Sequence, residues 1–405
     1  MNKAVRTCLV TASLLASFAG LVASPATGED PARPADLSLA APSTLDLPAS
    51  SPLLQRLTTL AQAPASGDKR GHHHRPPPPP TLATFTGVVA IGRTRYRYTL
   101  VGTNPQLRRA QNVVVPVAVI PLSMEFSDGT VLDTSQPDTC LGGLSALTAA
   151  MQSPLFQDFD YGEGPRQFLE QIRRLEFWQF TGPGKLNPGY SVRLSPTVLP
   201  TQTLALSPTS FTEQVACLST GGSQIMGHVD IRDFNNFLLS QVVPQFPQWG
   251  VNASNFVLIL LPYIDFHIPG DPYIVAYHGA FYPPQGGVVT YAAAQLGAGG
   301  PGLVNIGALS HEFAEWLDDP YGDNDTPPWY WGNTGGQVTG CGEGLEVGDP
   351  MIGTFLPPVQ MPNGISYQAQ ETAFFSWFFQ QVPSLGFDGW YSSGGTFKSP
   401  APICH

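Results

Sequence analysis

The chain has 405 residues, of which 30 are acidic and 19 are Lys or Arg, so that its formal net charge is −11. This balance argues against nucleic acid or an anionic membrane surface as a partner, and favours a cation, a peptide or a neutral glycan. Charged residues make up only 12% of the chain, about half the usual share, and Ser, Thr, Gln, Asn, Gly and Pro take their place.

The N-terminus has the pattern of a secretory signal peptide. Lys3 and Arg6 precede an apolar run over residues 8–22, and small residues follow at 23–28. The run is short for a bilayer span and no basic stop-transfer flank follows it, so cleavage is favoured over the alternative of an uncleaved anchor. We therefore expect residues 1–26 to be a signal peptide, no membrane span in the mature chain, and a secreted or periplasmic location.

Residues 27–80 are rich in Ala, Pro and Ser and end in five consecutive prolines. Such a segment buries too little apolar surface to offset the entropy of ordering it, so it is expected to be a disordered linker. His72, His73 and His74 offer adventitious metal ligands, although a solvated low-complexity stretch is the simpler interpretation.

Residues 81–405 have the composition of a globular domain, with enough chain for one large domain or two lobes. β-Branched and aromatic residues predict strands at 84–90, 96–101, 113–126, 190–199, 255–261 and 288–294. Asp128 and Gly129 predict a hairpin turn into residues 130–132. Helices are expected at 142–151, 165–178, 231–243, 303–319 and 368–380. The predicted class is therefore α+β, with a strand-rich N-terminal part.

Four cysteines remain after the expected signal peptide. An even number in an exported chain predicts two disulfides, and a cysteine metal site is disfavoured because no two cysteines form a Cys-x-x-Cys pair. Sequence order weakly favours Cys140 with Cys217 and Cys341 with Cys404 among the three possible connectivities.

The most informative motif is the run from His311 to Glu315, which lies in the predicted helix 303–319. At 3.6 residues per turn, His311 and Glu315 share one face and can converge on a cation. Glu312 is their neighbour and is the candidate general base, as in His-Glu-x-x-His zinc metallopeptidases, although here Glu replaces the second His.

A catalytic zinc needs a third protein ligand, and the acidic segment after the helix offers candidates. Glu346 is the first choice, followed by Asp349 and Glu343. Asp318, Asp319 and Asp349 are also candidates for orienting the His311 imidazole. In the alternative interpretation these acids only stabilise turns. His278 is a candidate for contacting a substrate carbonyl at the end of a strand, although a structural role is favoured for a lone His in an apolar context.

The motif residues also carry a resemblance. Residues 309–320 together with the run from Glu346 to Pro350 resemble a group of uncharacterised secreted bacterial proteins, and are more distantly similar to the plant exordium-type extracellular proteins. The resemblance extends over most of the globular part, including 167–178, Tyr277 to Gly279 and Phe374 to Trp377. It implies a zincin-like fold with an active-site helix and supplies no established activity.

The residue types thus predict an exported zinc-dependent hydrolase, with peptides or proteins as the expected substrates. The alternative is a non-catalytic secreted or wall-associated protein. Calcium is a second candidate cofactor, because Asp318, Asp319, Asp323 and Asp325 supply the oxygen donors that it prefers. A serine-hydrolase nucleophile elbow and a phosphate-binding Gly-Lys-Ser/Thr loop are both absent from the sequence.

Overall fold

The computed structural model describes residues 81–217, 222–267, 274–283, 286–300, 302–331 and 340–404, together with the two-residue strand β1 (Ala12–Ser13). The expected signal peptide, apart from β1, and the expected linker with its three histidines lie outside the described residues. Within the described part, no helix is both long enough and apolar enough to cross a membrane.

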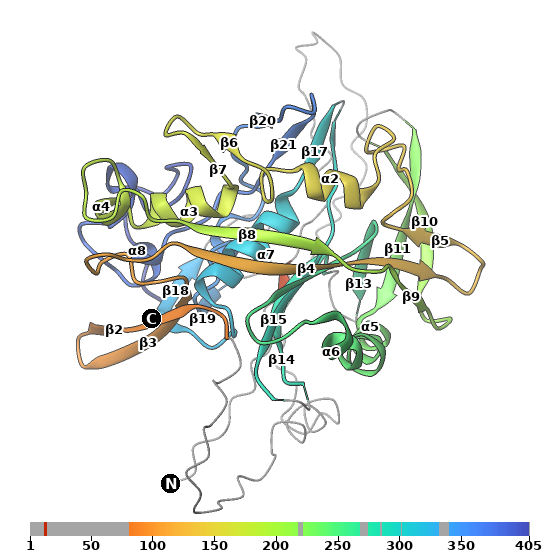
Figure 1. Cartoon of the computed structure of the whole chain (residues 1–405), viewed down its shortest axis with the longest axis horizontal. Coiled ribbons are helices and arrows are strands. Elements are labelled where there is room, and N and C mark those ends of the chain that lie inside the picture. Colours follow the sequence, from red (N-terminus) through yellow and green to blue (C-terminus); the bar gives the residue numbers. More distant parts are fainter. Residues whose placement is uncertain are drawn as a thin grey trace, which may run out of the picture.

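An eight-stranded mixed sheet forms the centre of the molecule (Figure 1). Its main path runs β1-β14-β15-β12-β4-β5, and β8 and β9 also pair with β4. Strands β15, β12, β4, β8 and β9 are joined by parallel pairings, whereas β14 is antiparallel to β15. The strands are β4 (Val113–Glu125), β5 (Val131–Asp133), β8 (Val192–Val198), β9 (Gln202–Ala205), β12 (Phe256–Leu260), β14 (Ala276–Phe281) and β15 (Val289–Ala294).

Strand β4 shows why this sheet is the middle layer. Its side chains alternate between two faces, as in any strand. Val117 and Val119 contribute to one hydrophobic core, while Ala118 and Ile120 contribute to the other. Because both faces are apolar, both must be covered.

Helix α7 (Gly307–Asp318) covers one face and is buried at every position. Trp316 stacks on Phe256 of β12 with ring centroids 4.0 Å apart, and its indole N–H donates to Thr290 Oγ1 of β15. Phe313 packs edge-on against the same Phe256. Figure 1 shows α7 behind β4 and β8. The other face is covered by α5 (Ile231–Phe237), the π-helical turn η1 (Leu238–Val242), η2 (Val243–Gln245) and α6 (Phe246–Trp249).

Smaller sheets surround these layers. They are β2 (Thr84–Ile91) with β3 (Thr94–Val101); β6 (Phe159–Asp160) with β7 (Pro165–Arg166); β10 (Phe211–Ala216), β11 (Ser223–Asp230) and β13 (Ile264–His267); β16 (Gly297–Gly300), β17 (Leu303–Asn305), β21 (Ser366–Gln368) and β20 (Val359–Gln360); and β18 (Asp325–Trp331) with β19 (Gly340–Gly344). The remaining helices are α2 (Ala146–Gln152), α3 (Phe168–Glu176), α4 (Trp178–Thr181), η3 (Asp349–Met351), α8 (Phe375–Phe378) and η4 (Phe387–Gly389).

The predicted α+β class and the hairpin at Asp128 and Gly129 are confirmed, since Glu125 of β4 pairs with Val131 of β5. Three predicted helices are wrong in part. The helix expected at 165–178 begins only at Phe168, because Pro165–Arg166 forms β7 and pairs with β6. The helix expected at 303–319 begins only at Gly307, because Leu303–Asn305 forms β17 and pairs in parallel with β21. The helix expected at 368–380 shrinks to α8, because the chain before it is extended, with Phe355 bridged to Gln370 and Ala373 to Ser392. Strand pairing has overridden the local helical pattern in all three places.

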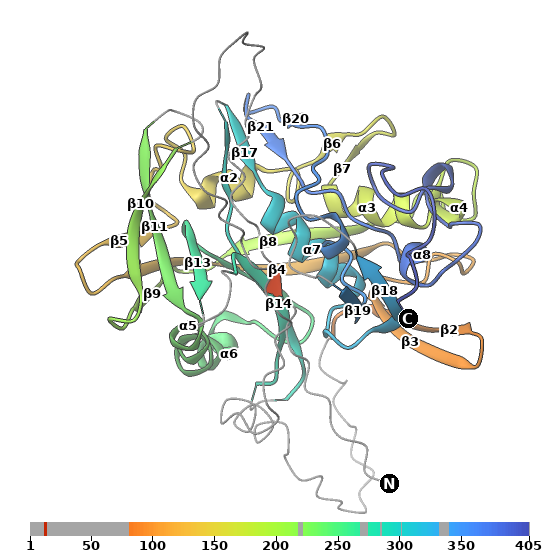
Figure 2. The ribbon, with the colours of Figure 1, turned by 180° about the vertical axis from the view of Figure 1, so that it is seen from behind.

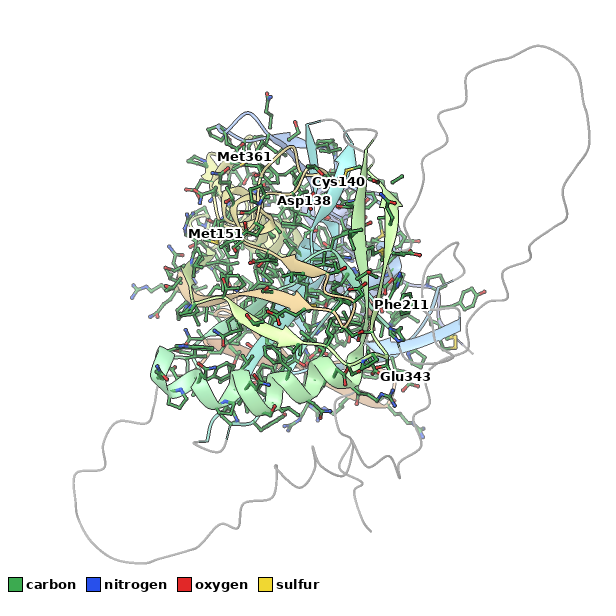
Figure 3. All side chains as sticks on the ribbon, turned by 90° about the vertical axis from the view of Figure 1, so that its right-hand side faces the viewer. Asp138, Cys140, Met151, Phe211, Glu343 and Met361 are labelled. Atoms are coloured by element: carbon green, nitrogen blue, oxygen red, sulfur yellow. A yellow bond between two sulfur atoms is a disulfide. The ribbon has the colours of Figure 1, made fainter. Side chains whose placement is uncertain are left out.

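The four cysteines form two disulfides. Cys140 pairs with Cys217 at a Cα–Cα separation of 5.4 Å, and Cys341 pairs with Cys404 at 5.7 Å. These are the pairings that sequence order favoured. The first anchors the loop in which the Cys140 N–H donates to Asp138 Oδ1, and Figure 3 labels these two residues side by side.

A buried ionic network fixes the C-terminal end of α7. The Arg173 guanidinium of α3 lies 2.6 Å from Asp318 Oδ1 and 2.6 Å from Glu176 Oε2, and it donates to the Leu317 carbonyl. Glu176 in turn accepts the backbone N–H of Phe375 at the start of α8. One cation therefore ties together three helices whose apolar faces form the core.

We predict that Arg173→Met destabilises the fold by about 3–5 kcal/mol, because Asp318 and Glu176 would remain buried without their cation. Chemical denaturation monitored by circular dichroism measures this loss. The matched control is Arg232→Met, which removes an exposed partner of Asp230 and is expected to cost at most about 1 kcal/mol. Equal losses in the two variants would contradict a structural role for the Arg173 network.

Candidate metal centre

The centre of the site is one face of α7. His311 and Glu315 lie one turn apart, and His311 Nε2 is 3.0 Å from Glu315 Oε1. Both side chains are 0% exposed. This contact follows from the helical spacing alone, as the sequence predicts. On the opposite side of the helix, Trp316 stacks on Phe256 and Phe313 packs edge-on against it, and these contacts turn the side that carries His311 and Glu315 away from β12.

Strand β14 brings His278 to the same place. Ala276 of β14 belongs to the core on the α7 side of the sheet, and alternation places His278 on that side as well. His278 Nδ1 lies 3.2 Å from Glu312 Oε2 and 3.4 Å from Glu315 Oε2. His278 therefore lies within a strand rather than at its end, and it contacts the candidate base directly.

The segment from Glu346 to Asp349 closes the site from a third direction. Asp349 Oδ1 is 3.7 Å from His311 Nε2, and the Gly348 N–H donates to Glu315 Oε1. A Cβ atom at Gly348 would lie 2.5 Å from His311 Nδ1, so only glycine permits this approach. Glu346 Oε2 lies 4.0 Å from His278 Nε2.

Two groups of side chains converge closely enough to hold a metal ion within the described part of the chain. One comprises His311, Glu315 and Asp349, and the other His278, Glu312 and Glu315. In each group the candidate ligand atoms lie within 4.8 Å of one another. Glu315 belongs to both groups, since one of its oxygens faces His311 and the other faces His278.

Some carboxylate oxygens in this cluster accept no hydrogen bond from the described residues. Glu312 Oε1 and Asp349 Oδ1 are buried and accept no hydrogen bond from any described residue. A buried carboxylate oxygen without a donor costs free energy, and a bound cation removes that cost. The donor set of imidazole nitrogens and carboxylate oxygens fits zinc.

Burial and mutual repulsion shift the ionisation of the acids. Burial, followed by the Glu315 charge, raises the pKa of Asp349 to about 8 and that of Glu346 well above its usual value. Burial opposes ionisation of Glu315 as well, but the facing charges of His311 and His278 outweigh it and lower its pKa to about 2. Burial disfavours the charged imidazole of His311, yet Glu315 raises its pKa to about 10. In the metal-free protein, His311, Glu346 and Asp349 therefore keep protons that a bound cation would displace.

Gln370 is a site residue that the sequence did not indicate. Its Nε2 lies 2.9 Å from His311 Nδ1 and donates to the Gly348 carbonyl, while its buried Oε1 has no hydrogen bond among the described residues. Turning the amide by 180° would present Oε1 to an Nδ1–H, which is the tautomer that binds metal through Nε2. The Gly348 carbonyl would keep the Met351 N–H as a donor.

The other acidic candidates have different surroundings. Asp319 accepts the backbone N–H groups of Asp323 and Asn324 and so shapes the turn after α7. Asp318 pairs with Arg173. Glu343 is exposed on β19. Neither convergent group contains Asp323 or Asp325, the further oxygens on which the calcium hypothesis depends.

No protein-family model, no curated protein and no solved structure matches this chain.

We predict that the metal-free protein loses stability as the pH rises from about 5 to 9. The pKa values of Asp349 and Asp319 are raised to about 8 and 7, so the folded state retains protons that the unfolded state has released. The raised pKa of His311 acts in the same direction, and the lowered pKa of Glu315 removes stability only at acidic pH.

Thermal midpoints measured in EDTA at pH 5, 7 and 9 test this expectation. Zinc should stabilise most at the highest pH, because its binding displaces protons from the same groups. A midpoint in EDTA that rises between pH 5 and 9 would contradict the assignment.

Proposed function

We propose that this protein is an exported, zincin-like, metal-dependent hydrolase whose zinc is held by His311, Glu315 and Asp349. The observation that carries the proposal is that candidate ligand atoms of these three buried side chains lie within 4.8 Å of one another. In addition, Asp349 Oδ1 accepts no hydrogen bond from any described residue. Asp349 replaces Glu346 as the preferred third ligand, because Glu346 faces His278 instead. A buried helix packed beneath a mixed sheet supports the zincin-like interpretation.

Glu312 is the general base in this proposal. It follows the first ligand in sequence and does not belong to the proposed ligand set, so its carboxylate remains available to hold a proton. His278 positions it through the 3.2 Å contact between Nδ1 and Glu312 Oε2. The zinc, when bound, would lower the pKa of a water molecule to about 7. Glu312 would accept the proton of that water and pass it to the leaving group.

Peptides are the favoured substrates because of strand β14. Its outer edge pairs antiparallel with Ala12–Ser13 at Ala276 and Tyr277, directly beside His278. Figure 2 shows β1 next to β14. The edge thus accepts an extended backbone, which is how many proteins bind peptides. Removal of the expected signal peptide would leave this edge open.

One observation favours the alternative, a non-catalytic exported protein with a structural site. His311, Glu312 and Glu315 are each 0% exposed, whereas a catalytic metal needs an open coordination position. The two functions differ in what Glu312 does: it is essential for turnover in the first and dispensable in the second.

We predict one zinc per chain in protein whose His72, His73 and His74 are replaced by Ala, and loss of that zinc in the additional variant His311→Ala. Elemental analysis after exhaustive dialysis measures the ratio. The matched control is His267→Ala, on β13 outside both convergent groups, which should retain the metal. Absence of metal from the parent protein would refute the proposal.

We predict that Glu312→Gln retains zinc and lowers peptide hydrolysis by about 10²–10⁴-fold, the usual contribution of a general base. Cleavage of a fluorogenic peptide library measures the rate. Glu213→Gln, at a largely exposed position on β10, is the matched control and should leave the rate unchanged. If the parent protein binds zinc but cleaves no peptide, the non-catalytic alternative is favoured.

A further inference from the structure

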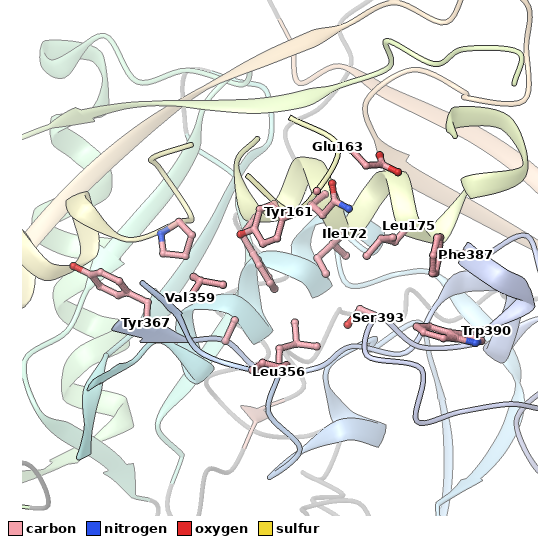
Figure 4. Close-up of a pocket in the computed structure, with 16 residues that line it drawn as sticks. Tyr161, Glu163, Ile172, Leu175, Leu356, Val359, Tyr367, Phe387, Trp390 and Ser393 are labelled. Atoms are coloured by element: carbon pink, nitrogen blue, oxygen red, sulfur yellow. The ribbon is translucent and has the colours of Figure 1, made fainter. Parts of the chain in front are cut away.

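A cavity of about 510 Å³ lies between α3 and the C-terminal segments that carry Leu356, Val359 and Trp390 (Figure 4). None of its lining residues belongs to either group of converging metal ligands. A cavity of this volume is within the usual range for binding a small organic molecule. It is therefore a candidate binding site separate from the proposed metal centre.

The walls of the cavity are mostly apolar. Ile172 and Leu175 of α3 form one side, and Leu356 and Val359 form the other. Five aromatic side chains also line it: Tyr161, Phe168, Tyr367, Phe387 and Trp390. A ligand with an apolar body would remove this surface from water together with its own, and this burial stabilises the complex.

Contacts beside the cavity hold its two walls together. Gln179, in α4 directly after α3, donates its backbone N–H to the Leu385 carbonyl and its side-chain Nε2–H to the Ser384 carbonyl. Trp178 packs edge-on against Phe387, with ring centroids 4.9 Å apart. Because the walls are already fixed to each other, a ligand would bind without the cost of ordering them.

The polar residues of the lining offer a ligand few hydrogen bonds. The Tyr161 hydroxyl and Gln171 Oε1 have almost no accessible surface, so a molecule in the cavity cannot reach them. Ser393 Oγ already accepts the Thr372 backbone N–H. Recognition in this cavity therefore depends on apolar contact rather than on hydrogen bonds.

The charges around the cavity disfavour ions of either sign. Among the described residues that line it, Glu163 alone carries a formal charge. Its carboxylate would repel an anion, and because Arg174 is already its partner at 3.4 Å, it supplies little attraction for a cation. The Lys398 ammonium, 3.9 Å from the centre of the Trp390 ring, opposes a cation further. Any ion would also lose its hydration among the apolar walls, so the lining favours a neutral ligand.

We propose that this cavity binds a neutral, predominantly apolar small molecule, which packs between α3 and residues 356–359. Charged amphiphiles, such as fatty acids and long-chain amines, are excluded by the loss of hydration and by the surrounding charges. This site is independent of the proposed hydrolase activity.

Fluorescence titration of the full chain with the neutral probe N-phenyl-1-naphthylamine tests whether the cavity binds an apolar molecule. One saturable site is expected. Leu175→Trp and Val359→Trp fill the cavity from opposite walls, and each should abolish the site. The control Val88→Trp, at an exposed position on β2, should retain it. Absence of a saturable site in the parent protein, or its survival in either filled variant that keeps the parent's circular dichroism spectrum, would overturn the proposal.

Displacement of the probe at pH 7 by 1-naphthylmethanol, 1-naphthylmethylammonium and 1-naphthoate tests the preference for a neutral ligand. The three compounds share one ring system and differ in charge. The alcohol should displace the probe at a concentration about tenfold lower than either ion, because it loses no ionic hydration on binding. Equal or better displacement by either ion would overturn the assignment of a neutral ligand, and this result requires no variant to fold.

Discussion

The constraint on which the structure depends is the complete burial of a helix that carries a histidine and two glutamates. Trp316 stacks on Phe256 and Phe313 packs edge-on against it, so one side of α7 faces the sheet. The motif side is then enclosed as well, and charged groups there must find partners inside the protein. The arrangement of β14, of the Gly348 loop and of Gln370 follows from this requirement.

The surrounding elements provide partners for only some of these buried charged groups. Gly348 approaches closely enough to donate to Glu315, and His278 faces two glutamates. Asp349 and Glu346, however, add negative charge to the site, and their raised pKa values show that the metal-free cluster disfavours full ionisation. A divalent cation would neutralise two of these charges. By contrast, Asp318 at the end of α7 and Glu176 of α3 already have Arg173 as their cation, and they need no metal.

The sequence predicts the local part of this site and little of the rest. The His311–Glu315 contact depends only on helical spacing, and the disulfide pairs follow sequence order. His278 and Gln370 reach the helix through strand β14 and an extended segment, which are long-range pairings without a local signal. The same segment was expected to be helical. Asp349 is preferred to Glu346 because Asp349 faces His311 whereas Glu346 faces His278, and these orientations cannot be inferred from the spacing of the acids.

The proposed zinc site consists of His311, Glu315 and Asp349. Anomalous diffraction from zinc-soaked crystals, collected on either side of the zinc absorption edge, tests it most directly. The account predicts a single peak in the globular domain, about 2.0–2.2 Å from His311 Nε2 and from an oxygen of each of the two carboxylates. A peak beside His278 and Glu312 instead, or no peak within residues 81–405, would contradict it.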